Sequence, residues 1–246
     1  MPEIKVINRY LWIIIISSLA TYIFTWFFTE TLPKSDMIDP IIFTEPTQEP
    51  TDAEPFIKEF EDKKYMIRPQ YQYDIYGLIV SYQDLDEKWF NIYYENDPYN
   101  IKDLCIIWGD NVKDDDYTQV EYWSGTWTCY FRWYENKINF DHQKLSNNHI
   151  LPDNPEVAQV LKNAKRGDQV HFEGYLVNYS ILGNGGSERS SSITRTDTGN
   201  HACEVVYVKN FEIIQSYNNY WRLFNSLSFG LMLLAFGLKT YTFFFL

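Results

Sequence analysis

Histidine and cysteine, which hold most transition metals in proteins, are scarce in this sequence of 246 residues. The chain has four histidines and three cysteines, and none of them follow the H-x3-H or C-x2-C spacing of a metal site. The glycine-rich run Gly183–Gly186 lacks the Lys and the Ser/Thr of a P-loop and enters no helix. The sequence therefore predicts no metal, no cofactor and no coherent set of catalytic residues.

Basic side chains are also few. The chain has 21 Lys and Arg residues against 33 Asp and Glu, for a net charge of -12, and segment 30–220 alone carries 17 against 32. Because neutralisation of phosphates supplies most of the affinity of nucleic-acid-binding proteins, this balance argues against a DNA or RNA partner. Aromatic residues, by contrast, make up 18% of the chain, which excludes disorder for most of it.

Two segments are long and apolar enough to span a membrane. Tyr10–Phe28 has nineteen residues without a charge, which nearly matches a hydrocarbon layer of ~30 Å, and predicts a transmembrane helix over 10–29. A cleaved signal peptide is disfavoured because the apolar run is too long and no small-residue cleavage site follows it. The second predicted span is 221–241, with Trp221 and Tyr241 at the two headgroup levels. A surface-lying amphipathic helix is the alternative, disfavoured because this segment has no polar face.

The few charges beside the first span predict the orientation. Two basic residues, Lys5 and Arg9, precede the span, and the stretch after it is mainly acidic. The positive-inside rule therefore places residues 1–9 in the cytoplasm. A second span returns the tail, 242–246, to the same side, so the domain between the spans is expected outside the cytoplasm, in the periplasm or an equivalent compartment. A cytoplasmic domain with reduced cysteines is the alternative.

Between the first span and the domain, residues 30–70 are rich in proline and glutamate. Six of the ten prolines lie between Pro33 and Pro69. Such a composition favours extended polyproline geometry. We expect a semi-rigid acidic stalk, with a peptide ligand for a partner as the alternative.

Residues 71–216 have the short aromatic and β-branched runs of strands, separated by polar loops. Asn154 and Pro155 predict the start of a helix that covers 156–164. The order is strands, the helix, then two more strands. The expected strands cover 74–82, 104–109, 119–123, 126–134, 169–180 and 202–214.

This order, with the helix between the third and fourth main strands and Gly167–Gly174 leading into the fourth, resembles an OB-fold barrel over 71–214. The resemblance implies a mainly β fold, an OB-like or related small β-barrel with one helix. The two transmembrane helices predicted above flank it. The hairpin near Trp123 departs from a five-stranded barrel and leaves another small barrel or sandwich open. Two spans around a lumenal domain also resemble the mitochondrial membrane ubiquitin ligases and their bacterial relatives, in arrangement only.

All three cysteines lie on or at the start of expected strands. Neighbouring strands bring Cα atoms within disulfide range, so Cys105 and Cys129 are the expected pair if the compartment is oxidising. Three reduced, buried cysteines are the alternative. A further alternative is a catalytic Cys203 assisted by His201.

The loop over 182–201 is long and polar, and with the loop 83–100 it would flank the binding face of an OB-like barrel. We expect a ligand or partner site there, or else Asx turns and a local ion pair. The candidate binding residues are Arg195, Asp197, Asn200, His201, Asn148 and His149.

Together these features favour a binding or scaffolding module of the cell envelope with the bilayer and a protein as partners. They leave a homo-oligomer open. The competing class is an envelope hydrolase or transferase that uses Cys203 with His201, or a pair among Glu121, Glu173 and Glu204.

Overall fold

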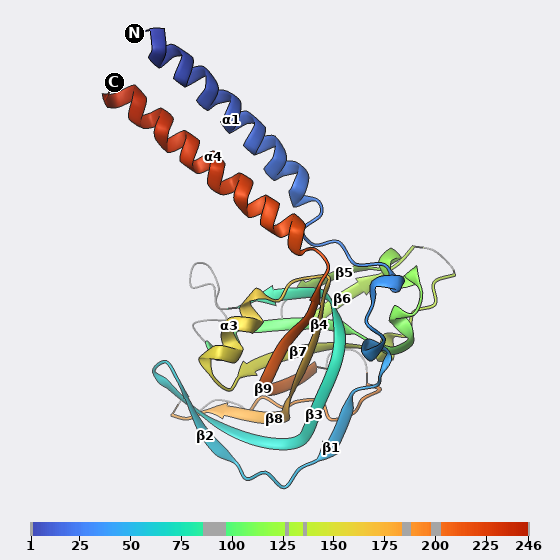
Figure 1. Ribbon diagram of the computed structural model, residues 1–246. Coiled ribbons are helices and arrows are strands. Elements are labelled where there is room, and N and C mark those ends of the chain that lie inside the picture. The colour runs from blue at the N-terminus through green and yellow to red at the C-terminus, as the bar shows by residue number, and fades with distance from the viewer. Residues whose placement is uncertain are drawn as a thin grey trace. The chain divides into compact units, whose positions relative to one another are not determined.

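The computed structural model describes residues 2–85, 97–125, 128–134, 137–183, 188–197 and 203–245. It has two compact units. Met1–Thr31 with Tyr217–Leu246 forms the first, and Leu32–Ser216 forms the second. Figure 1 labels the elements of both units, which are described separately below.

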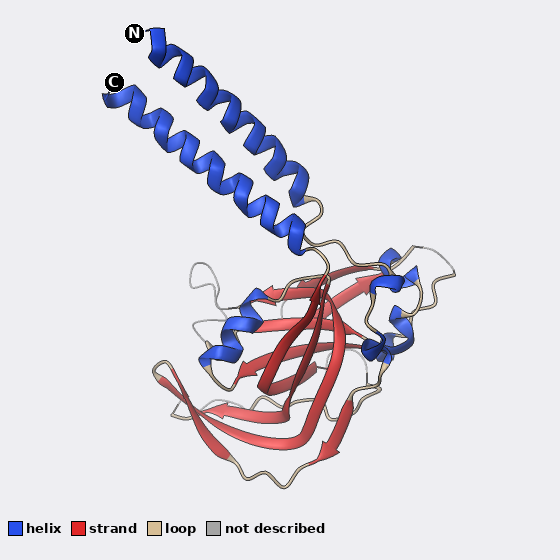
Figure 2. Cartoon of the chain, viewed as in Figure 1, coloured by secondary structure: helices blue, strands red, loops and turns tan. Residues whose placement is uncertain are grey.

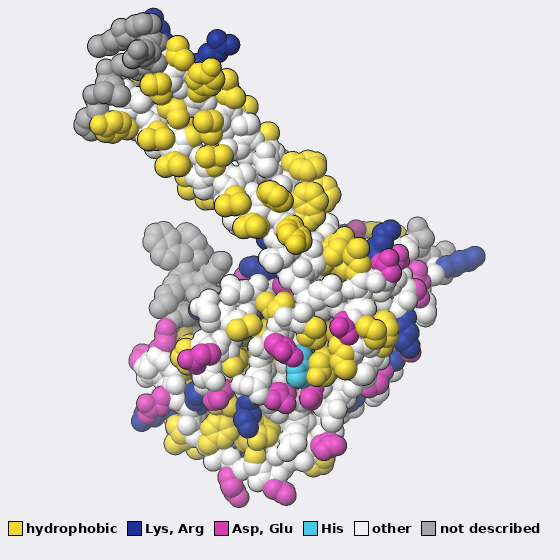
Figure 3. Space-filling model, viewed as in Figure 1, with side chains coloured by type: hydrophobic (Ala, Val, Ile, Leu, Met, Phe, Trp, Pro, Cys, Tyr) yellow, Lys and Arg dark blue, Asp and Glu magenta, His cyan; other side chains and the backbone are white. Residues whose placement is uncertain are grey.

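The first unit is a pair of helices, α1 (Pro2–Trp26) and α4 (Asn219–Phe245), which lie side by side (Figure 1). Leu11 and Ala235 are buried between them, and Asn225 Nδ2 donates to the carbonyl of Tyr22 at 2.8 Å. Most other apolar side chains face outward, and Figure 3 shows them along the visible face of the pair. By length and composition, each helix can cross a membrane. The two apolar helices thus support the expected membrane association.

The second unit is mainly β, as Figure 2 shows. Short 3-10 turns connect several of its strands. The elements are η1 (Ser35–Met37), η2 (Pro40–Phe43), β1 (Thr47–Pro50), β2 (Phe56–Phe60), β3 (Lys63–Asp84), β4 (Lys102–Ile107), η3 (Gly109–Val112), η4 (Asp115–Gln119), β5 (Glu121–Gly125), β6 (Thr128–Arg132), η5 (His142–Lys144), β7 (Leu145–Pro152), α3 (Pro155–Asn163), β8 (Asp168–Ile181) and β9 (Cys203–Ser216).

Five strands form a closed ring of pairings. The long strand β3 pairs antiparallel with both β4 and β8. β4 pairs antiparallel with β7, and β8 pairs antiparallel with β9. The parallel pair β7–β9 completes the ring, while β1 and β2 add to β3 outside it. The mainly β fold with two flanking helices is therefore confirmed.

The predicted stalk over 30–70 was wrong. Strands β1 and β2 both pair with β3, and Ile38 and Ile42 are buried in the second unit. Proline does not prevent this arrangement, because Pro50 ends an edge strand and Pro69 lies beside a bulge in β3. The compact unit therefore starts at Leu32, well before the expected residue 71.

The main core combines inward-facing strand positions with the apolar side of α3. Ile75, Leu104 and Phe172 are fully buried in it, and Leu161 of α3 packs in the same cluster. Helix α3 begins where the sequence predicted, since Asn154 Oδ1 accepts a hydrogen bond from the backbone of Val157 at 2.9 Å.

Strands β8 and β9 approach each other very closely at Gly174. A Cβ atom at this position would lie 2.0 Å from the carbonyl oxygen of Tyr207. The pairing shifts register between Glu173 and Gly174, which is the irregularity that needs a residue without a side chain.

Candidate functional site

The candidate residues Asn148 and His149 lie on opposite faces of β7, since successive side chains alternate along a strand. Asn148 shares the face of core residue Ile150, and its Nδ2 donates to Ser146 Oγ at 2.8 Å. On the other face, His149 Nδ1 lies 2.7 Å from Asp103 Oδ1 of β4. The two neighbours therefore do not join one polar cluster.

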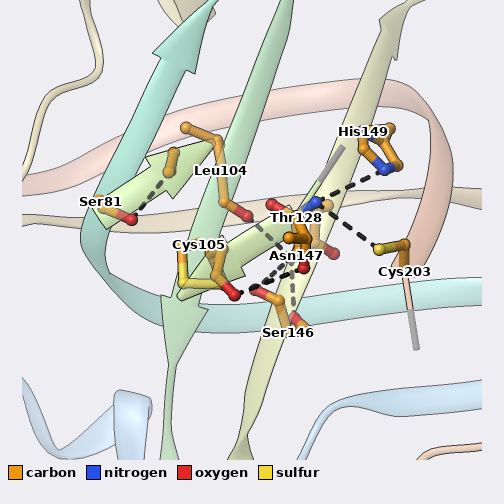
Figure 4. Close-up of a disulfide and its surroundings, with 11 residues drawn as sticks. Ser81, Leu104, Cys105, Thr128, Ser146, Asn147, His149 and Cys203 are labelled. Carbon is orange, nitrogen blue, oxygen red and sulfur yellow. Dashed lines mark hydrogen bonds between the residues drawn. A yellow bond between two sulfur atoms is a disulfide. The ribbon is translucent and has the colours of Figure 1, made fainter. Parts of the chain in front are cut away.

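The face with His149 carries a polar row across β7 and β9. Asn147 Nδ2 lies 3.4 Å from His149 Nε2 and 3.7 Å from Cys203 Sγ, and Figure 4 shows both contacts as dashed lines. Burial raises the pKa of the Cys203 thiol above its ordinary value. A protonated thiol is a poor nucleophile, so the row gives little support to a Cys203 enzyme.

Arg195 makes an ion pair with a buried acid. Its Nη1 lies 3.1 Å from Glu204 Oε1 of β9, and its guanidinium carbon lies 4.7 Å from the ring centre of Trp108 and 5.8 Å from that of Tyr73. Trp108 is held in turn by a hydrogen bond of 2.9 Å from Nε1 to Glu45 Oε2. The local ion pair, one of the two alternatives for Arg195, is present in the structure.

Glu204 lies deep in the second unit, with about 5% of its surface exposed. Burial raises the pKa of its carboxyl to about 7, although the Arg195 guanidinium acts in the opposite direction. From the sequence, Glu204 was a candidate only for a hydrolytic carboxylate pair, and its pairing with Arg195 was not predicted. The alternation along β9 could have predicted the burial of Glu204, because Glu204 shares a face with Val206 and Val208, which are core residues.

Asp197 makes local contacts. Its Oδ2 accepts a hydrogen bond of 2.5 Å from Ser192 Oγ, and its backbone amide donates to the carbonyl of Thr194 at 3.4 Å. Such contacts are typical of turns. Asn200 and His201, the remaining candidates of this loop, lie outside the described residues.

The strands β5 and β6 present an exposed stack of aromatic side chains and one arginine. Trp123 and Tyr130 are opposite each other on the two strands, with ring centres 5.4 Å apart and planes at 16°. The Arg132 guanidinium carbon lies 5.4 Å from the ring centre of Trp123 and 5.3 Å from that of Tyr134. The exposed fractions are 42% for Trp123, 44% for Tyr130 and 72% for Tyr134. We call these four residues the aromatic stack.

The opposite face of this hairpin is attached to the sheet. Cys129 of β6 pairs with Cys105 of β4, with the Cα atoms 5.8 Å apart, as the sequence predicted. Ser124 Oγ lies 2.9 Å from Ser81 Oγ of β3, and Figure 4 includes both the disulfide and Ser81. The aromatic stack is therefore presented on a hairpin held by a covalent link and a polar contact.

The three carboxylates of the hydrolase alternative have different partners. Glu121 accepts a hydrogen bond of 2.6 Å from Arg132, Glu173 accepts one of 2.5 Å from Asn210, and Glu204 pairs with Arg195. Within the described part of the chain, no group of three or more His, Cys, Asp or Glu residues could hold a metal ion.

No protein-family model, no curated protein and no solved structure matches this chain. Its function is therefore inferred from the geometry described above.

Proposed function

We propose that this protein is a membrane-anchored binding or scaffolding module, whose OB-like domain lies outside the cytoplasm and binds a protein partner of the cell envelope through the aromatic stack. The two apolar helices are its anchor.

The OB-like assignment is supported by the order of strands in the ring, β3-β4-β7-β9-β8, which returns to β3. An OB-fold is a ring of five strands with a helix between the third and fourth strands, counted along the chain. Counted in this way, the third and fourth strands of the ring are β7 and β8, and α3 lies between them. The hairpin β5–β6 is then an insertion between the second and third strands of the ring.

The extracytoplasmic location is supported by the Cys105–Cys129 pair, because disulfides persist mainly in oxidising compartments. The charges beside the first span favour the same side. Both termini would then lie in the cytoplasm.

The observation that carries the binding function is the aromatic stack. Trp, Tyr and Arg are the residues that contribute most binding energy at protein interfaces. Here they are exposed side by side on a hairpin fixed by a disulfide, and a preformed surface loses little conformational entropy on binding. An enzyme based on Cys203 has less support, since its side chain is only partly exposed and burial raises the pKa of its thiol.

The test is site-specific photo-crosslinking in intact cells. A photo-reactive phenylalanine analogue replaces Tyr134, or Ile57 of β2 as a control with a 55% exposed side chain. We expect a discrete crosslinked protein from position 134, its yield at least fivefold lower in the Trp123→Ala background, and no such product from position 57. The same product from both positions, or none from position 134, would contradict the proposal.

A further inference from the structure

The surroundings of the Arg195 guanidinium form a compact cage. The carboxylate of Glu204 lies at one side, and the rings of Trp108 and Tyr73 lie within 6 Å. A carboxylate together with aromatic faces is the combination that proteins use to hold organic cations. Arg195 itself demonstrates that a guanidinium fits.

Arg195 uses the cage only in part. Both of the side-chain hydrogen bonds that it makes to described residues come from Nη1, to Glu204 Oε1 at 3.1 Å and to the Tyr73 hydroxyl at 3.4 Å. The strong form of an arginine–carboxylate pair is bidentate, with two parallel N–H donors on the two carboxylate oxygens. The cage can therefore hold a guanidinium more fully than Arg195 does.

Two buried acceptors in this region are not satisfied. Glu204 Oε2 and Asn148 Oδ1 have no hydrogen-bond partner among the residues that the structure describes. Asn148 and Glu204 are paired positions on the parallel strands β7 and β9, so both side chains project from the same face. A buried acceptor without a donor costs free energy, and a ligand with several N–H groups would remove that cost.

The charge around the cage suits a cationic partner. Segment 30–220 carries a net charge of -15, although Glu45, the acceptor for Trp108, is itself paired with Lys144 at 2.6 Å. An acidic surface draws positively charged partners and disfavours anionic ones. The Arg195 side chain is about 24% exposed, so the cage is open to solvent on the side where Arg195 enters it.

From these observations we infer that Glu204, Trp108 and Tyr73 form a recognition site for a guanidinium group, which Arg195 occupies within the chain and which an arginine side chain of a partner protein takes by replacing it. The planar guanidinium fits better than an ammonium, because it stacks on rings and presents paired donors to a carboxylate. This site is separate from the aromatic stack and does not depend on its function.

The test uses the full chain in detergent and the variant Arg195→Met, which removes the guanidinium and keeps an unbranched apolar side chain beside Trp108. Binding of methylguanidinium is measured by calorimetry at pH 8. We expect saturable binding to Arg195→Met that is at least tenfold tighter than to the natural chain. Methylammonium should bind at least fivefold more weakly than methylguanidinium.

Two further comparisons identify the site and the class of partner. The double variant Arg195→Met, Glu204→Gln should lose the binding at least tenfold. A pentapeptide with a central arginine should bind to Arg195→Met, whereas the same peptide with citrulline, which is neutral and of similar shape, should not. A folded Arg195→Met chain that does not bind methylguanidinium, or binds it equally well without the Glu204 carboxylate, would overturn the inference.

Arg195→Lys provides the same test if Arg195→Met does not fold. It keeps a cation opposite Glu204 but offers no paired donors, so added methylguanidinium should bind at least threefold more tightly than to the natural chain. Equal affinity for the two chains would overturn the inference.

Discussion

The buried carboxyl of Glu204 predicts an unusual dependence of stability on pH. Its pKa is about 7 in the folded chain and has the ordinary value of 4.5 in the unfolded chain. Between these values the folded state binds more protons than the unfolded state, so stability falls as pH rises. The full effect is about 3 kcal/mol, and most of it develops between pH 5 and pH 8.

Glu204→Gln should remove this loss, because glutamine has nearly the same shape and does not ionise. We expect the free energy of unfolding of the natural chain, relative to that of Glu204→Gln, to decrease by about 2 to 3 kcal/mol from pH 5 to pH 8. Glu49→Gln, which changes an exposed acid of β1, serves as the matched control and should follow the natural chain.

Urea unfolding of the full chain in detergent, followed by tryptophan fluorescence at several pH values, measures these differences. Parallel pH profiles for the natural chain and Glu204→Gln would refute the reasoning, since Glu204 would then titrate alike in both states. If the free energy of unfolding of Glu49→Gln depended on pH as little as that of Glu204→Gln, the pH dependence would come from the overall negative charge of the chain and not from the Glu204 carboxyl.

Three other variants test the fold by the same unfolding assay. Replacing Cys105 and Cys129 together by serine opens a link between residues 24 apart and should cost about 3 kcal/mol, and unchanged stability would mean that the link is not formed. Gly174→Ala puts a Cβ atom against the Tyr207 carbonyl and should cost about 3 kcal/mol or more, so a neutral result would contradict the close approach of β8 and β9. Asn154→Ala removes the cap of α3 and should cost about 1 kcal/mol, whereas no loss would show that the cap is dispensable.

Local patterns were sufficient to predict many of the elements. Alternation over 126–134 placed Cys129 and Phe131 on one face and Tyr130 and Arg132 on the other, and the structure has this arrangement. Asn154 and Pro155 marked the start of α3 because capping depends on neighbouring residues only. Such features could be predicted because their causes lie within a few residues of the chain.

The elements that the sequence did not predict depend on contacts between residues far apart in the chain. Residues 30–70 have the composition of a linker, but Ile42 is buried against apolar residues of β3 and β4, and β1 pairs with a part of β3 more than 20 residues away. Strand β7 was missed for a similar reason. Its Ser146–His149 segment has little intrinsic preference for strand, and its pairing with β4 and β9 supplies the structure.

The candidate site illustrates the same limit. Arg195 and Glu204 are only nine residues apart in the sequence, so their pairing is local. The burial of Glu204, however, depends on the pairing of β7 with β9, which closes the ring. Grouping Asn148 with His149 followed their adjacency in sequence. Once β7 is a strand, that adjacency places them on opposite faces.

The side of the membrane on which the domain lies is the central claim, and labelling with a membrane-impermeant maleimide in intact cells tests it most directly. Cysteine is introduced at the exposed Asp62, in the turn between β2 and β3, or at Glu3 as a cytoplasmic control, each in a Cys203→Ser chain. The account predicts that Asp62→Cys is labelled in intact cells and that Glu3→Cys is labelled only after lysis. Labelling of Glu3→Cys in intact cells, with Asp62→Cys protected until lysis, would contradict it.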